Sequence, residues 1–246
     1  TLRSLEPGIW EFKSTGTAQQ LKLSGPDCPA DQLLTFRIAE VTSELTLPSL
    51  LMDGNIEIST DEYTINQLIE DVFIGGDCFE VEPGSIQYSG DSESVGYFSS
   101  GMDGINMEEG IILSTGLAPN AVGPNGRYNT GNWVDGSAND PDLSSLLDDN
   151  YPLRDRAALE FDFTPTSEMI SFEFVFASEE YCEYVNSDFN DVFGFFISGP
   201  GINGPFANNA INIAVVPGSN DYISINSINH YQNQPFFNNN IPFSQH

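Results

Sequence analysis

The stretch FEFVFASEEYCEYVNSDFNDVFGFFISGPG, residues 172–201, carries the two features that decide the fold. Its two ends are apolar and read as β-strands, whereas its middle is crowded with carboxylates and amides. The crowded part contains no Lys or Arg, and its acidic and amide residues are Glu179, Glu180, Glu183, Asp188 and Asp191, with Asn186 and Asn190. Like charges this close repel one another, so we expect the folded segment to need a neutralising cation.

The chemistry of these side chains favours one class of ion. Oxygen ligands without histidine suit a hard cation, so the sequence predicts Ca²⁺ rather than zinc or copper. The predicted ligands are Glu179, Glu180, Asp188, Asn190 and Asp191. The alternative interpretation is a solvated acidic turn between two strands, the ordinary outcome for a run of like charges.

The overall charge excludes several partners. The 246 residues include 36 acidic and only 7 basic side chains, which gives a formal net charge of −29. Nucleic acids and anionic membrane surfaces require a Lys/Arg footprint, so neither is an expected partner. Such acidity fits an extracellular, cation-rich medium, and a 39% hydrophobic content indicates a folded chain rather than a disordered one. No apolar run is long enough to insert into a bilayer, and the first ten residues do not read as a signal peptide, which does not exclude secretion.

The distribution of short apolar runs predicts the fold class. Turn residues separate strand-like runs at 72–74, 85–88, 95–98, 110–114, 159–163, 169–177, 192–198, 211–216 and 222–225. Helical spacing is confined to residues 61–71 and 142–147. We therefore expect an all-β fold, a β-sandwich or jelly roll, with one or two short helices and long loops.

The chain divides into two parts of different character. Residues 1–62 form a predicted β-rich extension, and residues 63–246 form the predicted sandwich. The loop-like stretch 117–150 ends in several Asp residues, which we interpret as a hydrated loop, with a second cation site as the alternative.

The three cysteines do not form a CxxC pair, so a structural zinc site is not expected. Cys78 and Cys182 each adjoin a strand-like run and are the predicted disulfide, which leaves Cys28 free or paired with another chain. Three unpaired buried thiols are the alternative.

No catalytic pattern stands out, and we expect no enzymatic activity. His230 is the histidine that a Ser-His-Asp triad would have to use, yet the sequence lacks a G-x-S-x-G elbow. A packed or surface imidazole is the expected role of His230. Paired carboxylates such as Glu179 and Glu180 point to opposite faces of a strand, so they do not form a glycosidase pair by themselves.

Three stretches resemble the choice-of-anchor L domain of bacterial surface proteins. They are GGDCFEVEPGSIQYSG at residues 75–90, EEGIILSTG at 108–116 and FVFASEEYCEYVNSDFNDVFGFFISGPG at 174–201. The resemblance runs from about residue 65 to the C-terminus. It implies a secreted, β-rich module of large exported proteins that varying C-terminal anchors hold to the envelope, and it carries over no catalytic residues.

The resemblance also implies further strands beyond residue 243, where this sequence is about to end. A sandwich without its last strands would leave unpaired edges, which a neighbouring chain fills when it donates a strand. Residues 9–13 are the candidate donor, and an incomplete sequence is the alternative. The predicted function is a Ca²⁺-stabilised structural or adhesive surface module, a filament or layer subunit that binds other surface-protein chains or itself. A carbohydrate-binding module or part of a polysaccharide-acting enzyme is the alternative, with Trp133 and Tyr128 as a platform for glycans.

Overall fold

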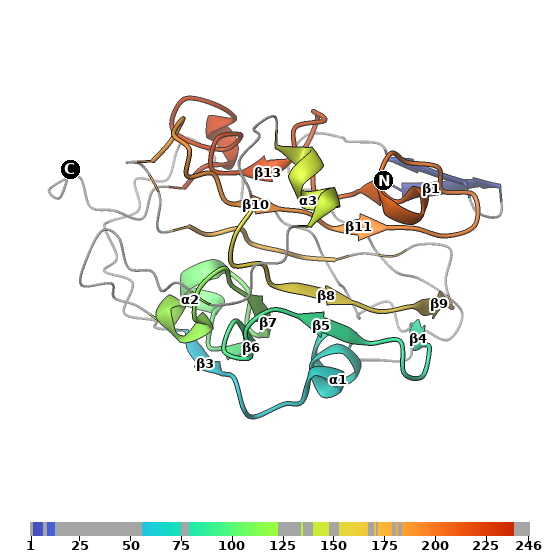
Figure 1. Ribbon diagram of the computed structural model, residues 1–246, viewed down its shortest axis with the longest axis horizontal. Helices are drawn as coiled ribbons and strands as arrows, with labels where there is room; N and C mark the ends of the chain where they lie inside the picture. The colour runs from blue at the N-terminus through green and yellow to red at the C-terminus, as the bar shows by residue number, and fades with distance from the viewer. Residues whose placement is uncertain are drawn as a thin grey trace, which may run out of the picture.

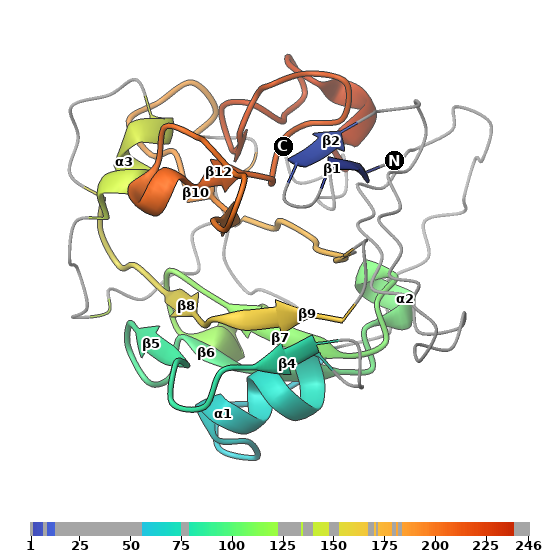
Figure 2. The same cartoon turned by 90° about the vertical axis from the view of Figure 1, so that its right-hand side faces the viewer.

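The computed structural model describes residues 2–6, 9–12, 56–74, 79–122, 134, 140–147, 153–166, 170, 172–178, 181 and 184–238. Its elements lie in two layers, which Figure 1 shows from the side and Figure 2 after a quarter turn. Among the residues just given, no helix is both long and apolar enough to cross a membrane.

The lower layer in Figure 2 consists of three antiparallel groups of short strands. Strand β6 (Val95–Ser99) pairs with β3 (Glu57–Ser59) on one side and with β7 (Gly110–Leu113) on the other. The remaining strands form two pairs, β4 (Phe79–Val81) with β9 (Phe163–Pro165) and β5 (Gln87–Ser89) with β8 (Ala158–Glu160).

The upper layer is made from the C-terminal part of the described chain. Strand β10 (Val192–Phe193) pairs with β13 (Ile223–Ser224), and β11 (Phe196–Ile197) pairs with β12 (Ile211–Asn212). A separate antiparallel hairpin joins β1 (Leu2–Glu6) to β2 (Ile9–Phe12) near the N-terminus. All these pairs are antiparallel, and the prediction of a mainly β fold is confirmed.

The helical segments of the described chain are short. They are α1 (Ile65–Gln67), the π-helical turn η1 (Leu68–Phe73), α2 (Met102–Ile105), α3 (Pro141–Leu146) and the 3₁₀ turns η2 (Ala118–Val122), η3 (Ala207–Asn209) and η4 (Gln234–Phe236). The helix expected at 61–71 begins with a capping box, in which the Thr64 hydroxyl accepts from the Gln67 amide and the Gln67 side chain accepts from the Thr64 amide.

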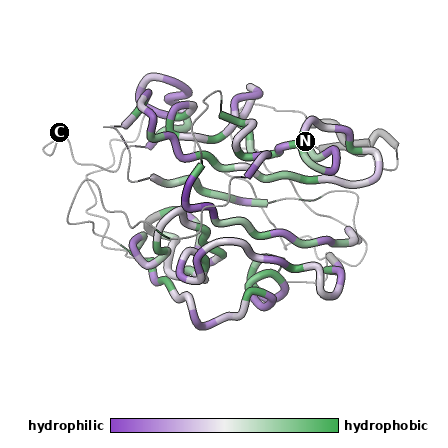
Figure 3. The backbone as a smooth tube through the Cα atoms, in the orientation of Figure 1, coloured by the Kyte–Doolittle hydropathy of each residue, from purple (hydrophilic) through white to green (hydrophobic). Residues whose placement is uncertain are grey.

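Two clusters of buried apolar residues hold the layers together. The first cluster is Ile69, Ile74, Ile170 and Phe172, and the second is Ala214, Val216, Ile223 and Ile228. Phe174 and Phe195 pack against both clusters, so the two cores are continuous. The apolar segments through the middle of the molecule are mostly green in Figure 3, whereas the loops along its upper edge are largely purple.

The segment at residues 172–178 connects the two cores through its alternating side chains. Phe172 is 5% exposed and packs in the first cluster, and Phe176 packs against the second, whereas Val175 is 46% exposed. This burial has the predicted period of two. The described part of 169–177 is nevertheless not a β-strand, so the expected strand there is wrong although its facing is right.

The strand expected at residues 72–74 is also wrong. The helix that Thr64 caps continues through Phe73, and the Ile74 amide donates to the Ile69 carbonyl at 3.0 Å. This five-residue hydrogen-bond step turns Ile69 and Ile74 toward the same core cluster. Packing of both isoleucines thus overrides the β-propensity of this short apolar run.

Candidate functional site

The predicted cation site falls partly within the described residues. Glu179 and Glu180 lie outside them, as do both cysteines of the predicted disulfide, Cys78 and Cys182, and these predictions stay predictions. Asp188, Asn190 and Asp191 are described and lie in one loop, residues 184–191, which we call the acidic loop. The acidic loop leads directly into β10, so its end is fixed to the upper layer.

One asparagine from a distant part of the chain holds the acidic loop in place. The Asn226 side-chain carbonyl accepts from the Asn186 amide at 2.6 Å, and the Asn226 amide donates to Oδ1 of Asn190 at 2.9 Å. The Asn226 side-chain NH₂ also donates to the Ser187 carbonyl at 3.4 Å. Amide groups, rather than charges, therefore fix the backbone of this loop.

The tip of the acidic loop faces solvent. Asp188 is exposed, and the neighbouring Phe189 ring is 54% exposed. Phe189 contacts Tyr184 edge to face, with the ring centroids 5.0 Å apart. The tip thus presents an aromatic pair beside a free-standing carboxylate.

Asp191 differs from Asp188 because it lies at the base of the loop. Its main-chain carbonyl accepts from the Ile225 amide at 3.2 Å, and its side chain is largely shielded from water. Burial raises the pKa of the Asp191 carboxyl above its ordinary value, and the nearby negative charge of Asp155 raises it further. Asp155 itself has a left-handed backbone with φ of 55°. A buried carboxylate beside another carboxylate is costly when both are ionised, and a bound cation relieves that cost.

The donor set suits Ca²⁺ chemically but is incomplete. Within the described ranges, no three His, Cys, Asp or Glu side chains come close enough together to hold a metal ion. Asp191 and Asp155 supply carboxylate oxygens, and the second lone pair of Asn190 Oδ1 remains a possible donor. Ca²⁺ takes six to eight oxygen ligands in typical sites. Glu179 and Glu180, which precede the acidic loop in sequence, are the predicted residues that would complete the set.

The loop that carries Asn226 is itself organised by buried polar side chains. Asn229 is 1% exposed, and its side chain makes four hydrogen bonds with the backbone of Ile225, Asn226, Tyr231 and Gln232. Ser224 and Ser227 are also buried and bond to each other, Oγ to Oγ, at 3.2 Å. This rigid support positions Asn226 against the acidic loop.

The sequence did not single out three of these residues, Asn226, Asn229 and Asp155. Their roles depend on contacts across tens of residues, which periodicity does not reveal. The signal that could have pointed to the asparagines is the abundance of Asn after residue 203, because Asn side chains bond nearby backbone and stabilise tight turns.

His230 lies beside aromatic residues, as expected for a packed imidazole. Its ring centroid is 3.9 Å from that of Tyr231 and 6.3 Å from that of Phe237. Nδ1 of His230 is buried and has no hydrogen-bond partner among the described residues.

The comparison with protein families bears on this whole region. The model of the choice-of-anchor L domain matches residues 57–245, which is most of the chain and includes the acidic loop and its support. The chain belongs to the choice-of-anchor L family. Comparisons with curated proteins and with solved structures gave no significant match.

Membership of the choice-of-anchor L family gives this protein a coarse assignment, a surface-associated or secreted protein. The match begins at residue 57, before the predicted domain boundary between residues 62 and 63. The start of the match coincides with β3, which pairs with β6 in the lower layer. The division of the chain at residue 62 stays a prediction.

Proposed function

We propose that this protein is a non-enzymatic structural or adhesive module of an extracellular surface, and that Ca²⁺ stabilises its acidic loop. The observation that carries the proposal is the position of Asp191. Its carboxylate is largely buried at the base of the loop, beside Asp155, and its pKa is raised by both burial and that neighbour. An extracellular divalent cation offsets this cost without any change to the backbone that Asn226 holds.

Calorimetric titration with Ca²⁺ tests the proposed site directly. We expect the parent protein to bind Ca²⁺, and the double variant Asp188→Ala with Asp191→Ala to lose this binding. The matched control is Glu160→Ala with Asp162→Ala, which removes two exposed carboxylates at the end of β8 and so changes the net charge equally. Equal binding by both double variants would show that Ca²⁺ responds only to the overall negative charge.

We also propose that the module associates with other surface-protein chains or with copies of itself through strand donation. The candidate donor strand β2 pairs with β1 of its own chain, so donation requires this hairpin to open or to add to a sheet edge as a unit. Strand β7 is such an edge in the order β3-β6-β7, and its Leu113 is 40% exposed. Sedimentation velocity over a concentration series should show assembly that deletion of residues 1–13 abolishes. Unchanged assembly after the deletion would contradict strand donation by this segment.

A carbohydrate-binding module is the second candidate, and two exposed aromatic side chains favour it. Phe189 is 54% exposed and Tyr231 is 72% exposed, on two loops that Asn226 links. Exposed rings beside amide groups suit the apolar faces and hydroxyls of a neutral sugar. The aromatic platform first expected from the sequence, Trp133 with Tyr128, lies outside the described residues. A glycan array should show binding that Phe189→Ala and Tyr231→Ala weaken, and an array without any signal would remove this candidate.

A further inference from the structure

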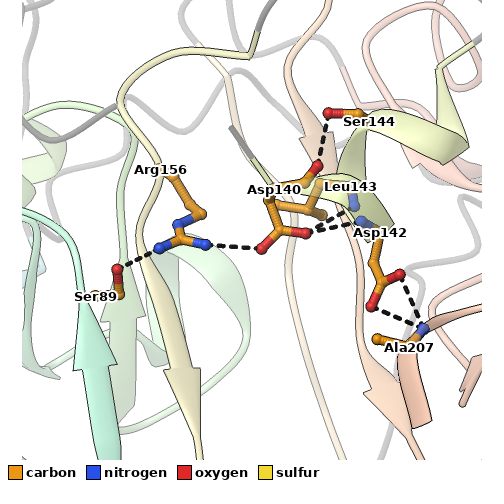
Figure 4. Close-up of polar contacts among 7 residues, drawn as sticks. All are labelled: Ser89, Asp140, Asp142, Leu143, Ser144, Arg156 and Ala207. Carbon is orange, nitrogen blue, oxygen red and sulfur yellow. Dashed lines mark hydrogen bonds and ion pairs between the residues drawn. The ribbon is translucent and has the colours of Figure 1, made fainter. Parts of the chain in front are cut away.

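A chain of polar contacts joins the lower layer to the upper layer through helix α3, as Figure 4 shows. Arg156 donates to the Ser89 hydroxyl on β5 and forms an ion pair with Oδ2 of Asp140 at 2.9 Å. Asp140 caps α3, because its Oδ1 accepts from the amides of Asp142 and Leu143. Asp142 then accepts from the Ala207 amide of the upper layer at 3.0 and 3.2 Å. We call Ser89, Arg156, Asp140 and Asp142 the polar clasp.

The ion pair in the polar clasp is shielded from solvent. The side chains of Arg156 and Asp140 are 17% and 20% exposed. Nε of Arg156 is fully buried and has no hydrogen-bond partner among the described residues. Removal of one partner from such a pair leaves an uncompensated charge in a dry setting, which is far more disruptive than loss of an exposed salt bridge.

Apolar contacts hold α3 less extensively than the polar clasp does. The helix has six residues, and a helix this short does not persist without tertiary support. Leu146 is its buried apolar residue, and Leu143 approaches Gly194 so closely that a Cβ at Gly194 would lie 3.0 Å from a Leu143 methyl. Gly194 directly follows β10, and β10 directly follows Asp191 of the acidic loop. Helix α3 thus covers the surface beside the base of the acidic loop.

We propose that the Arg156–Asp140 ion pair is a releasable fastening, and that α3 opens away from β10 without unfolding of the sheets. Opening uncovers Gly194 and the adjacent side of β10 and gives this face two states, one covered and one accessible. The two core clusters contain no residue of α3, so the sheets retain their packing when the helix leaves. This inference does not depend on Ca²⁺ binding or on the adhesive role.

Native-state hydrogen exchange of the whole chain tests the polar clasp. In Arg156→Gln, we expect the Ser144 and Leu147 amides of α3 to exchange about a hundredfold faster, by the usual cost of breaking a buried ion pair. The amides of β6 should keep their parent rates. Arg154→Gln is the matched control, because it removes the same charge from an exposed arginine two positions away.

Asp140→Asn separates the ion pair from helix capping. Asn caps a helix as well as Asp does, so this variant keeps the cap and removes only the charge that faces Arg156. It should reproduce the faster exchange of α3, and the double variant with Arg156→Gln should add little to either single change. Exchange in Arg156→Gln no faster than in Arg154→Gln would overturn the proposal. An equal rise at the β6 amides, or loss of folding in both single variants, would also overturn it, because α3 would then unfold only with the sheets.

Discussion

The replacement of Asn229 by Ala should destabilise the support of the acidic loop by a predictable amount. The Asn229 side chain is 1% exposed and donates to the carbonyls of Ile225 and Asn226 at 2.9 and 3.1 Å. Its carbonyl accepts from the amides of Tyr231 and Gln232 at 2.8 and 2.9 Å. At about 0.5–1.5 kcal/mol for each hydrogen bond, the loss of four gives about 2–6 kcal/mol, and we expect about 3 because water reaches the two exposed residues.

Thermal unfolding followed by circular dichroism measures this loss. For a domain of this size, about 3 kcal/mol corresponds to a fall in Tm of about 6–12 °C. Asn229→Asp should cost at least as much, since a carboxylate oxygen would then face the carbonyls of Ile225 and Asn226. Asn203→Ala is the control, because Asn203 is exposed, and it should change the stability by less than about 0.5 kcal/mol. If Asn229→Ala and Asn203→Ala melt together, Asn229 does not support the loop in the way that its contacts indicate.

Three further predictions concern single sites. The raised pKa of Asp191 means that its ionised form costs folding stability, so without Ca²⁺ the parent should gain stability as the pH falls through that raised pKa toward the ordinary value of 3.8; Asp191→Asn should gain less, and equal gains in chemical denaturation would contradict the assignment. Gly204→Ala should destabilise by about 3 kcal/mol, because the added Cβ would lie 1.9 Å from the Ala210 carbonyl oxygen, and an unchanged Tm would show that the backbone moves there at little cost. Burial, and then the charge of Asp91, raise the pKa of Tyr88 to about 12, so stability should fall as the pH rises above the ordinary value of 10.0, and a phenolate absorbance titration of Tyr88→Phe should lack the ionisation near 12.

Local sequence patterns predicted those elements whose causes are local. Strands β6 and β7 match the expected runs at 95–98 and 110–114, because each is a short apolar run bounded by turn residues. The α1 helix was predictable because its polar cap and apolar spacing lie within one short stretch.

Elements that depend on distant partners were less predictable. The single strand expected at 159–163 is two strands, since β8 pairs with β5 and β9 pairs with β4. A period-two pattern does not reveal that two halves of a run have different partners. The alternation at 172–178 predicted the buried face, but it did not reveal that the segment packs between the layers without being a strand.

The candidate site shows the same division. The acidic composition of residues 184–191 was visible in the sequence, and so were its flanking apolar runs. The contacts of Asn226 with Asn186 and Asn190 join segments that lie far apart in the sequence, and Asp155 reaches Asp191 from the loop before β8. These pairings follow from the packing of the upper layer, which a single sequence does not specify at the level of individual side chains.

The most direct test of the proposed Ca²⁺-stabilised surface module is the melting temperature of the parent protein across a Ca²⁺ titration, with EDTA as the zero point. Ca²⁺ at a hundred times its Kd stabilises a folded protein by about 2.7 kcal/mol. For a domain of this size, that corresponds to a rise in Tm of about 5–11 °C. The account predicts this rise in the parent protein and its absence in Asp191→Asn. The same melting temperature in Ca²⁺ and in EDTA would contradict the account and leave the acidic loop as a solvated turn that Asn226 holds.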